Sequence, residues 1–193
     1  MTILLANIHA LACILFAYLI GSIPSGYLVG RCAGVGDIRE YGSGNIGATN
    51  VARVLGLKYF YLVFFLDSFK AFSCLSFIQL IGFPQAVILA AASALMVGNG
   101  CSLFLNFKGG KGIATGFGIL LALQPAVLCY LAWVWLAVFL MTRTVGVASV
   151  AVLVALPFCS YQCTSEGPLA VFMVVLSLWC LIRHQSNIRQ FLG

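Results

Sequence analysis

The chain has 193 residues, of which 63% are hydrophobic and 7% charged, whereas a soluble domain is roughly 25% charged. This composition excludes a water-soluble surface, so most side chains must face lipid or other apolar helices. The net charge of +6 is compatible with binding to nucleic acid, to anionic lipid or to an anionic substrate. The positions of the Lys and Arg residues in the chain distinguish these three partners.

Six apolar stretches follow one another, at residues 3–29, 59–81, 84–105, 113–141, 145–163 and 168–182. Residues 128–141 are apolar on every face, which excludes the alternating strands of a transmembrane barrel and predicts an all-α, polytopic membrane protein. The fourth stretch exceeds the roughly 20 residues that cross a bilayer. Gln124–Pro125 lies inside it, where a helix breaks or turns.

The basic residues test whether the fourth stretch is one helix or two, because Lys and Arg collect on the cytoplasmic side. With two helices there are about seven spans, and every Lys and Arg except Lys70 falls on one side. We therefore predict seven transmembrane helices, with the N-terminus out and the C-terminus in. Residues 113–123 are then too short to cross at about 1.5 Å per residue, so we expect a short or re-entrant helix there.

This length supports one membrane-embedded domain over residues 1–193, without a linker or an internal repeat. The eight cysteines lie mostly in apolar stretches, so we expect reduced, buried thiols. Their surroundings offer too few ligands for a metal ion, and neither a metal nor a cofactor is predicted.

The first polar patch is a glycine-rich run at residues 42–50, with Arg53 just beyond it. Glycines let backbone N–H groups approach a ligand, and hydroxyl and amide side chains add donors without charge. A helix that begins near Thr49 would add partial positive charge, which suits an oxyanion. A polar loop before a capped helix is the alternative. The candidate binding residues are Ser43, Gly44, Asn45, Gly47, Thr49, Asn50 and Arg53.

The second patch, residues 106–115, has two lysines on either side of a diglycine. Ammonium groups and free backbone N–H groups suit a phosphate, although a lysine pair at a membrane edge can also be a simple positive-inside anchor. A Walker A loop is excluded, because it would need glycine where Leu105 stands. The candidates are Lys108, Gly109, Gly110, Lys111, Gly112 and Thr115.

The third patch is residues 183–189, where His184 and Asn187 share a helix face. Here a belt of snorkelling arginines is the alternative to a site. Elsewhere, Gly26 and Gly30 predict close helix packing, and Asp67 with Lys70 predicts an ion pair inside the bundle. The residues show no nucleophile with its base, so an enzyme of this kind would need an activated substrate.

Together these patches resemble the acyl-phosphate:glycerol-3-phosphate acyltransferase family of bacterial inner membranes. The resemblance rests on residues 21–26, 43–50 and 107–115, and it spans nearly the whole chain in family order. It also includes Asp67, Lys70, Thr142, Arg143, Ser149, His184, Asn187 and Ile188. The chain departs from the family pattern at Asn99, Gly146 and Gln185, and it ends before a Gly-x-Glu tail.

The resemblance implies a seven-helix enzyme with its motifs on the cytoplasmic side. Such an enzyme transfers a fatty acyl group from acyl phosphate to the 1-hydroxyl of glycerol 3-phosphate, giving lysophosphatidic acid and phosphate. The resemblance implies catalytic roles for Lys108, Arg53, His184 and Asn187. It also implies that these four residues, together with Ser149, bind mainly glycerol 3-phosphate. Ser43, Asn45 and Thr49 would bind mainly the acyl-phosphate head group.

Two other functions remain as alternatives. A transporter of an organic phosphate would also need basic loops and broken helices. Its polar residues, however, would be expected near the midplane of the bilayer, at a site reachable from both sides. A scaffold subunit with a cationic edge leaves the glycine-rich runs unexplained. The expected partners are therefore glycerol 3-phosphate, acyl phosphate and membrane lipids, without nucleic acid, and the oligomeric state is left open.

Overall fold

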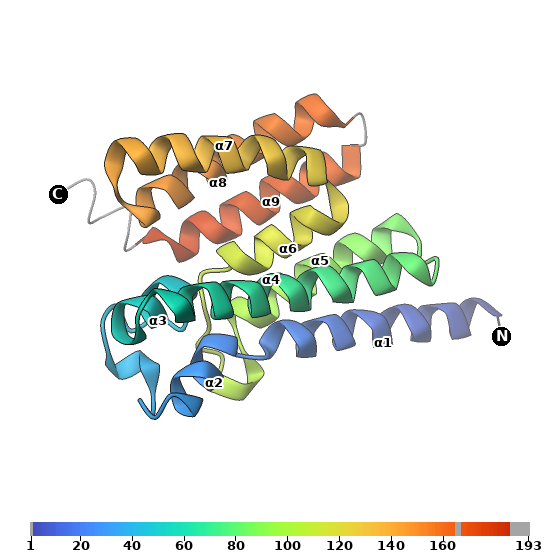
Figure 1. Ribbon diagram of the computed structural model, residues 1–193. Coiled ribbons are helices and arrows are strands. Elements are labelled where there is room, and N and C mark those ends of the chain that lie inside the picture. The colour runs from blue at the N-terminus through green and yellow to red at the C-terminus, as the bar shows by residue number, and fades with distance from the viewer. Residues whose placement is uncertain (1, 165–166, 186–193) are drawn as a thin grey trace. The chain divides into compact units, whose positions relative to one another are not determined.

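The structure is a computed structural model that describes residues 2–164 and 167–185 (Figure 1). Its described part is built from helices joined by short loops and turns. In chain order these are α1 (Thr2–Ser22), α2 (Ser25–Cys32), η1 (Ile38–Glu40), α3 (Ala48–Leu55), α4 (Leu57–Leu80), α5 (Gln85–Gly100), η2 (Leu103–Leu105), α6 (Ile113–Leu123), α7 (Pro125–Thr142), α8 (Val145–Cys163) and α9 (Gly167–Arg183).

Five segments of the described chain are long and apolar enough to cross a membrane. They are Leu4–Cys32, Leu57–Leu80, Gln85–Leu105, Pro125–Thr142 and Val145–Cys163. Two shorter apolar helices, α6 and α9, accompany them. The chain is thus an all-helical, multi-pass membrane protein, while the count of seven spans and the orientation stay predictions.

The predicted break in the fourth apolar stretch is confirmed. Helix α6 ends at Leu123, and α7 begins at Pro125 with Gln124 as its N-cap residue. Proline is favoured at the first helical position because the N–H that it lacks would have no partner there. The short helix expected at residues 113–123 therefore exists with those bounds.

The chain forms two compact units, Met1–Ala122 and Leu123–Gly193. The single domain over residues 1–193 stays a prediction. In the first unit, α1 packs along α5. The helices meet at Gly21 and Gly98, where a Cβ on Gly98 would lie 2.8 Å from the backbone nitrogen of Ser22 and would also strike the Tyr18 carbonyl. Because neither glycine has a side chain, the backbone at the end of α1 lies directly against the backbone at the end of α5.

Replacing Gly98 by alanine should lower the free energy of unfolding by about 1–3 kcal/mol, because the new methyl group meets backbone that cannot move aside. The measurement is the thermal unfolding midpoint of the purified protein in detergent. Gly116→Ala is the matched control, since a Cβ there meets only the flexible end of Met96 at 3.5 Å. Equal midpoints for the two variants would contradict the packing at Gly98.

In the second unit, two buried serine hydroxyls form hydrogen bonds that join α7, α8 and α9. The Ser160 hydroxyl donates to Oε1 of Gln124 at 2.8 Å, and the Ser177 hydroxyl donates to the Leu153 carbonyl. All three side chains are buried. These bonds fix the start of α7 against α8, and α8 against α9.

The expectation of buried thiols is only partly correct. Cys74 and Cys180 are buried, but Cys32, Cys129 and Cys163 are exposed on the protein surface. An apolar stretch in a membrane protein has no single buried face, because lipid also accepts a small hydrophobic side chain.

Candidate functional site

The first loop, residues 42–50, is closed by the amide of Asn50. The Nδ2 group donates to the carbonyl oxygens of Asn45 at 2.8 Å and Tyr41 at 3.0 Å, with a longer bond to Ile38 at 3.4 Å. Its Oδ1 accepts from the backbone N–H of Ser43 at 2.7 Å. Asn50 is 2% exposed, so it shapes the loop from inside.

The backbone donors of this loop are turned toward its own acceptors. The Gly47 N–H donates to Oδ1 of Asn45 at 2.8 Å, and the Gly44 N–H donates to the Tyr41 carbonyl at 3.1 Å. The backbone N–H groups of this run were expected to bind an oxyanion. Those of Ser43, Gly44 and Gly47 instead donate hydrogen bonds to acceptors of the protein itself. What this part of the loop offers a ligand is side-chain chemistry.

Helix α3 follows the loop and carries two of the predicted binding residues. Its N-cap is Gly47, so Thr49 lies in the first turn, where the helix adds partial positive charge. Thr49, Arg53 and Ser43 are all exposed. A Cβ on Gly42 would lie 3.5 Å from Cδ of Arg53, so the arginine stem runs beside the loop. The hydroxyl groups of Ser43 and Thr49 and the guanidinium of Arg53 are thus exposed on this loop and the helix that follows it.

The second loop, residues 106–112, begins with strained backbone. Asn106 and Phe107 have φ values of 52° and 61°, a left-handed conformation that is uncommon outside glycine and costs of order 1–3 kcal/mol where it occurs. The exposed Lys108 follows directly. This turn places the lysine between the end of η2 and the start of α6.

The diglycine of the second loop lies against the end of α5. The Gly110 N–H donates to the Asn99 carbonyl at 2.8 Å, and a Cβ on Gly109 would strike the carbonyls of Asn99 and Gly100. Gly112 has a φ of 91° and precedes α6. Only glycine fits at Gly109 and Gly112, so the run is required by the fold at these two positions, whatever it binds.

Ile46 joins the two loops. A Cβ on Gly110 would lie 3.6 Å from Cγ1 of Ile46 and 3.3 Å from Nδ2 of Asn99. Ile46 is 5% exposed. The structure therefore brings the two loops into contact within the first unit, at Ile46 and Gly110.

Ile46 and Asn99 are residues that the sequence reasoning did not select. Ile46 lies inside the first patch but is not among its candidates, and Asn99 was named only as a departure from the family pattern. An apolar residue amid glycines was the available signal that this position is a packing contact.

Close packing was predicted at Gly26 and Gly30, and it exists, with the first loop as the partner of Gly26 and the short helix η1 as the partner of Gly30. A Cβ on Gly26 would strike the Ile46 carbonyl, and a Cβ on Gly30 would lie 3.2 Å from the Cβ of Ile38. Helix α2 thus lies directly on the backbone of the first loop. A pattern of small residues indicates close approach without saying what approaches.

An ion pair lies beside the first loop, between Asp37 and Arg39. The guanidinium contacts the carboxylate at 2.6 Å, and the backbone N–H of Arg39 donates to Asp37 Oδ1 at 3.0 Å. The hydrogen bonds from Arg39 lower the pKa of Asp37. Arg39 also lies 5.5 Å from the ring centroid of Tyr27.

This pair predicts a small dependence of stability on pH. Because the folded pKa of Asp37 is lowered, its stabilising contribution is complete above the ordinary Asp pKa of about 3.9 and is lost as the pH falls through the lowered value. Asp37→Asn should remove that acid-dependent part, worth less than about 1 kcal/mol at this surface. Unfolding midpoints of both proteins, measured from neutral pH downward, should converge in acid, and parallel curves would contradict the assignment.

Two of the predicted residues that the structure describes belong to the second unit. Ser149 is buried in α8, and His184, which follows α9, is also buried. The Nδ1 atom of His184 lies 2.8 Å from the Cys180 carbonyl, which fixes the orientation of the imidazole ring. Asn187 lies outside the described residues. Thr115, in α6 of the first unit, is fully buried, and no hydrogen-bond partner for its hydroxyl occurs among the described residues.

The fold and these loops define the class of protein: a multi-pass helical membrane protein whose first unit holds basic and glycine-rich loops side by side. Within residues 2–164 and 167–185, no group of three His, Cys, Asp or Glu side chains could hold a metal ion.

Comparison with known proteins names the family within this class. Residues 11–193 match the family model described as glycerol-3-phosphate acyltransferase, and the chain belongs to that family. A glycerol-3-phosphate acyltransferase of Sinorhizobium medicae is 37% identical over 95% of this chain and 89% of its own length. One of Aquifex aeolicus is 38% identical over 95% of each chain.

Two solved structures have the same fold. One is a crystal structure of PlsY (YgiH), an integral membrane glycerol 3-phosphate acyltransferase, in its glycerol 3-phosphate form; its TM-score is 0.90 at 37% identity, over 95% of this chain and 92% of that one. The lysophosphatidic acid form has a TM-score of 0.87 at 35% identity, over the same shares.

Proposed function

We propose that this chain transfers a fatty acyl group to the 1-hydroxyl of glycerol 3-phosphate, giving 1-acylglycerol 3-phosphate, and that acyl phosphate is the donor. The observation that carries the proposal is its similarity to an acyltransferase crystallised in both a glycerol 3-phosphate form and a lysophosphatidic acid form. The choice of donor is supported by the chemistry of the residues, which supply cations and small polar groups but no nucleophile with a base.

The reaction balances without a covalent enzyme intermediate. The 1-hydroxyl oxygen attacks the acyl carbon of the mixed anhydride, the bond from that carbon to the phosphate oxygen breaks, and inorganic phosphate leaves. The hydroxyl proton moves to a phosphate oxygen of a substrate. The protein then has to hold two phosphate groups and stabilise their charge during transfer, which is the kind of task that preorganised cations perform.

The loops of the first unit suit this task. Lys108, between two strained residues and a diglycine, is proposed to bind a phosphate as a point charge, and Arg53 to bind one through its planar donors. Ser43 and Thr49 are proposed to contact the acyl-phosphate head group. Asn50, Gly109 and Gly110 act through the shape of the loops, because their polar groups or Cβ positions already face protein.

For the other predicted residues the proposal is simpler. Asn45 and Gly47 bond each other and are proposed to shape the acyl-phosphate site, with Gly44 beside them. Lys111, Gly112 and Thr115 are proposed to complete the phosphate loop. Ser149, His184 and Asn187 are proposed as glycerol 3-phosphate ligands, which alanine variants would test one at a time.

The proposed location is the bacterial inner membrane, with the loops facing the cytoplasm and seven spans. The asymmetric distribution of Lys and Arg supports this orientation. Glycerol 3-phosphate would then arrive from the cytosol and the acyl donor from the bilayer.

Phosphate release from the purified protein in lipid, supplied with palmitoyl phosphate, tests the function. Release that requires glycerol 3-phosphate, together with formation of lysophosphatidic acid, supports the acyltransferase. Binding of glycerol 3-phosphate without turnover would instead favour a transporter of an organic phosphate. A pH–rate profile set by one side chain and abolished in His184→Ala at unchanged binding would overturn the substrate phosphate as proton acceptor.

A further inference from the structure

An ion pair lies inside α4, in the membrane-spanning part of the first unit. The Lys70 ammonium contacts Asp67 Oδ1 at 2.7 Å, and the two side chains are 10% and 12% exposed. Charged groups at such a depth are expensive and are retained where they perform a task. Neither residue belongs to the loops described above.

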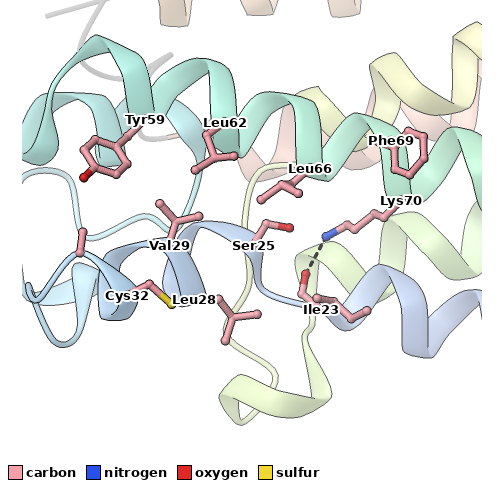
Figure 2. A pocket seen from close by; sticks show the side chains of 11 residues that line it. Ile23, Ser25, Leu28, Val29, Cys32, Tyr59, Leu62, Leu66, Phe69 and Lys70 are labelled. Atoms are coloured by element: carbon pink, nitrogen blue, oxygen red, sulfur yellow. Dashed lines mark hydrogen bonds between the residues drawn. The ribbon is translucent and has the colours of Figure 1, made fainter.

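Lys70 has a second partner, at the break between α1 and α2. Its ammonium donates to the Ile23 carbonyl at 2.7 Å, as the dashed line in Figure 2 shows. The break arises at Pro24, which has no backbone N–H and so interrupts the helical bonding. The Ser25 N–H also donates to the Ile23 carbonyl, at 3.1 Å. The lysine therefore holds α4 to the residue from which α2 departs.

Beyond this point α2 and α4 are separated by a groove of about 510 Å³. Apolar side chains from both helices line most of it, among them Leu28, Val29, Leu62 and Leu66 (Figure 2). Lys70 and Ile23 lie together at one end of the groove. The hydrogen bond between them therefore fixes the orientation of α2 at its start. The apolar side chains along the rest of the groove make contacts that have no preferred direction.

The other side of α2 meets the candidate site. Gly26 lies one residue into α2, and its missing side chain lets the helix rest on the Ile46 carbonyl. Ile46 in turn packs against Gly110 of the second loop. The direction in which α2 leaves the break therefore sets the position of the residue shared by both loops.

We propose that Lys70, oriented by Asp67, is a positioning residue for the active site. By holding the Ile23 carbonyl it fixes the direction of α2, and through Gly26 and Ile46 it fixes the spacing of the two loops. Its effect on turnover rests on the proposed function, whereas its effect on the loops does not.

Four variants separate this role from that of a simple buried charge pair. Lys70→Met removes the donor, and Lys70→Arg keeps a cationic donor. The exchanged pair Asp67→Lys/Lys70→Asp keeps opposite charges three residues apart but leaves no donor at position 70 for the Ile23 carbonyl. Ser73→Ala is the matched control, because the Ser73 hydroxyl bonds within α4, to the Phe69 carbonyl at 2.6 Å.

Two measurements are made on each protein in lipid: hydrogen–deuterium exchange of residues 43–50, and kcat and KM for glycerol 3-phosphate. In Lys70→Met and in the exchanged pair, exchange in this loop should accelerate while α5 and the second unit keep their protection. The ratio kcat/KM should fall about tenfold or more, because small displacements of positioned groups slow catalysis strongly. Lys70→Arg and Ser73→Ala should stay close to the parent protein in both measurements.

The outcomes separate the two proposals. Parent-like loop exchange and kinetics in the exchanged pair would overturn the positioning role and leave charge compensation alone. Accelerated exchange throughout the protein in both Lys70→Met and the exchanged pair would also overturn it. If the parent protein shows no turnover but the loop of these two variants exchanges faster, the acyltransferase proposal fails and the positioning of the loops stands.

Discussion

Replacing Lys108 by methionine is expected to lower kcat/KM for glycerol 3-phosphate by on the order of a hundredfold to a thousandfold, the loss typical when one preorganised group that stabilises transition-state charge is removed. Methionine keeps the length of the apolar stem, so the turn formed by Asn106 and Phe107 should persist. The measurement is phosphate release and lysophosphatidic acid formation at varied glycerol 3-phosphate, with the thermal midpoint checked in parallel.

Lys58→Met is the matched control for this change. Lys58 is also exposed, and its ammonium lies 5.0 Å from the ring centroid of Tyr59, so the variant removes the same charge from the same unit. Its kcat/KM should stay within about twofold of the parent value. Similar losses in the two variants would show that overall positive charge, rather than the loop lysine, drives the reaction.

Asn50→Leu is expected to have the second-largest effect, through the loop rather than the ligand. The side chain keeps a similar size, but the carbonyls of Tyr41 and Asn45 lose their donor and the Ser43 N–H loses its acceptor. Leaving such groups unpaired should lower the free energy of unfolding by about 2–3 kcal/mol. Turnover should fall more than tenfold, since Ser43 and Thr49 would no longer be held in register.

The two effects are read from the unfolding midpoint and from phosphate release. Asn7→Leu serves as the control, because Asn7 is exposed on α1 and both variants remove one amide. A parent-like midpoint in Asn50→Leu would mean that the loop is held in some other way, and that prediction would then be abandoned.

The elements that the sequence predicted best were those that depend on local chemistry. Pro125 ends one helix and starts another, because proline has no N–H and a fixed φ. Asp67 and Lys70 form the expected pair, because residues three apart on a helix lie on one face. The all-helical membrane class followed from composition and from apolar stretches that do not alternate with polar residues.

What the sequence did not predict were contacts made by backbone. The Asn99 carbonyl accepts from Gly110, and the Ile46 carbonyl lies against Gly26; neither depends on which side chain stands at the accepting position. For the same reason Asn50 looked like a ligand when considered by residue type, whereas its amide is engaged with loop backbone. Side-chain patterns identified the loops, and backbone geometry decided which of their groups remain for a substrate.

The closure of the first loop also bears on the order in which the protein folds. The partners that the Asn50 amide bonds all precede it, at Ile38, Tyr41, Ser43 and Asn45, so the loop can close as soon as residue 50 has left the ribosome. Contacts between residues near in sequence form fast because little chain entropy is lost. The second loop contacts Asn99 and Ile46, which both precede it in the chain, so the closed first loop can already be in place when the second loop is synthesised.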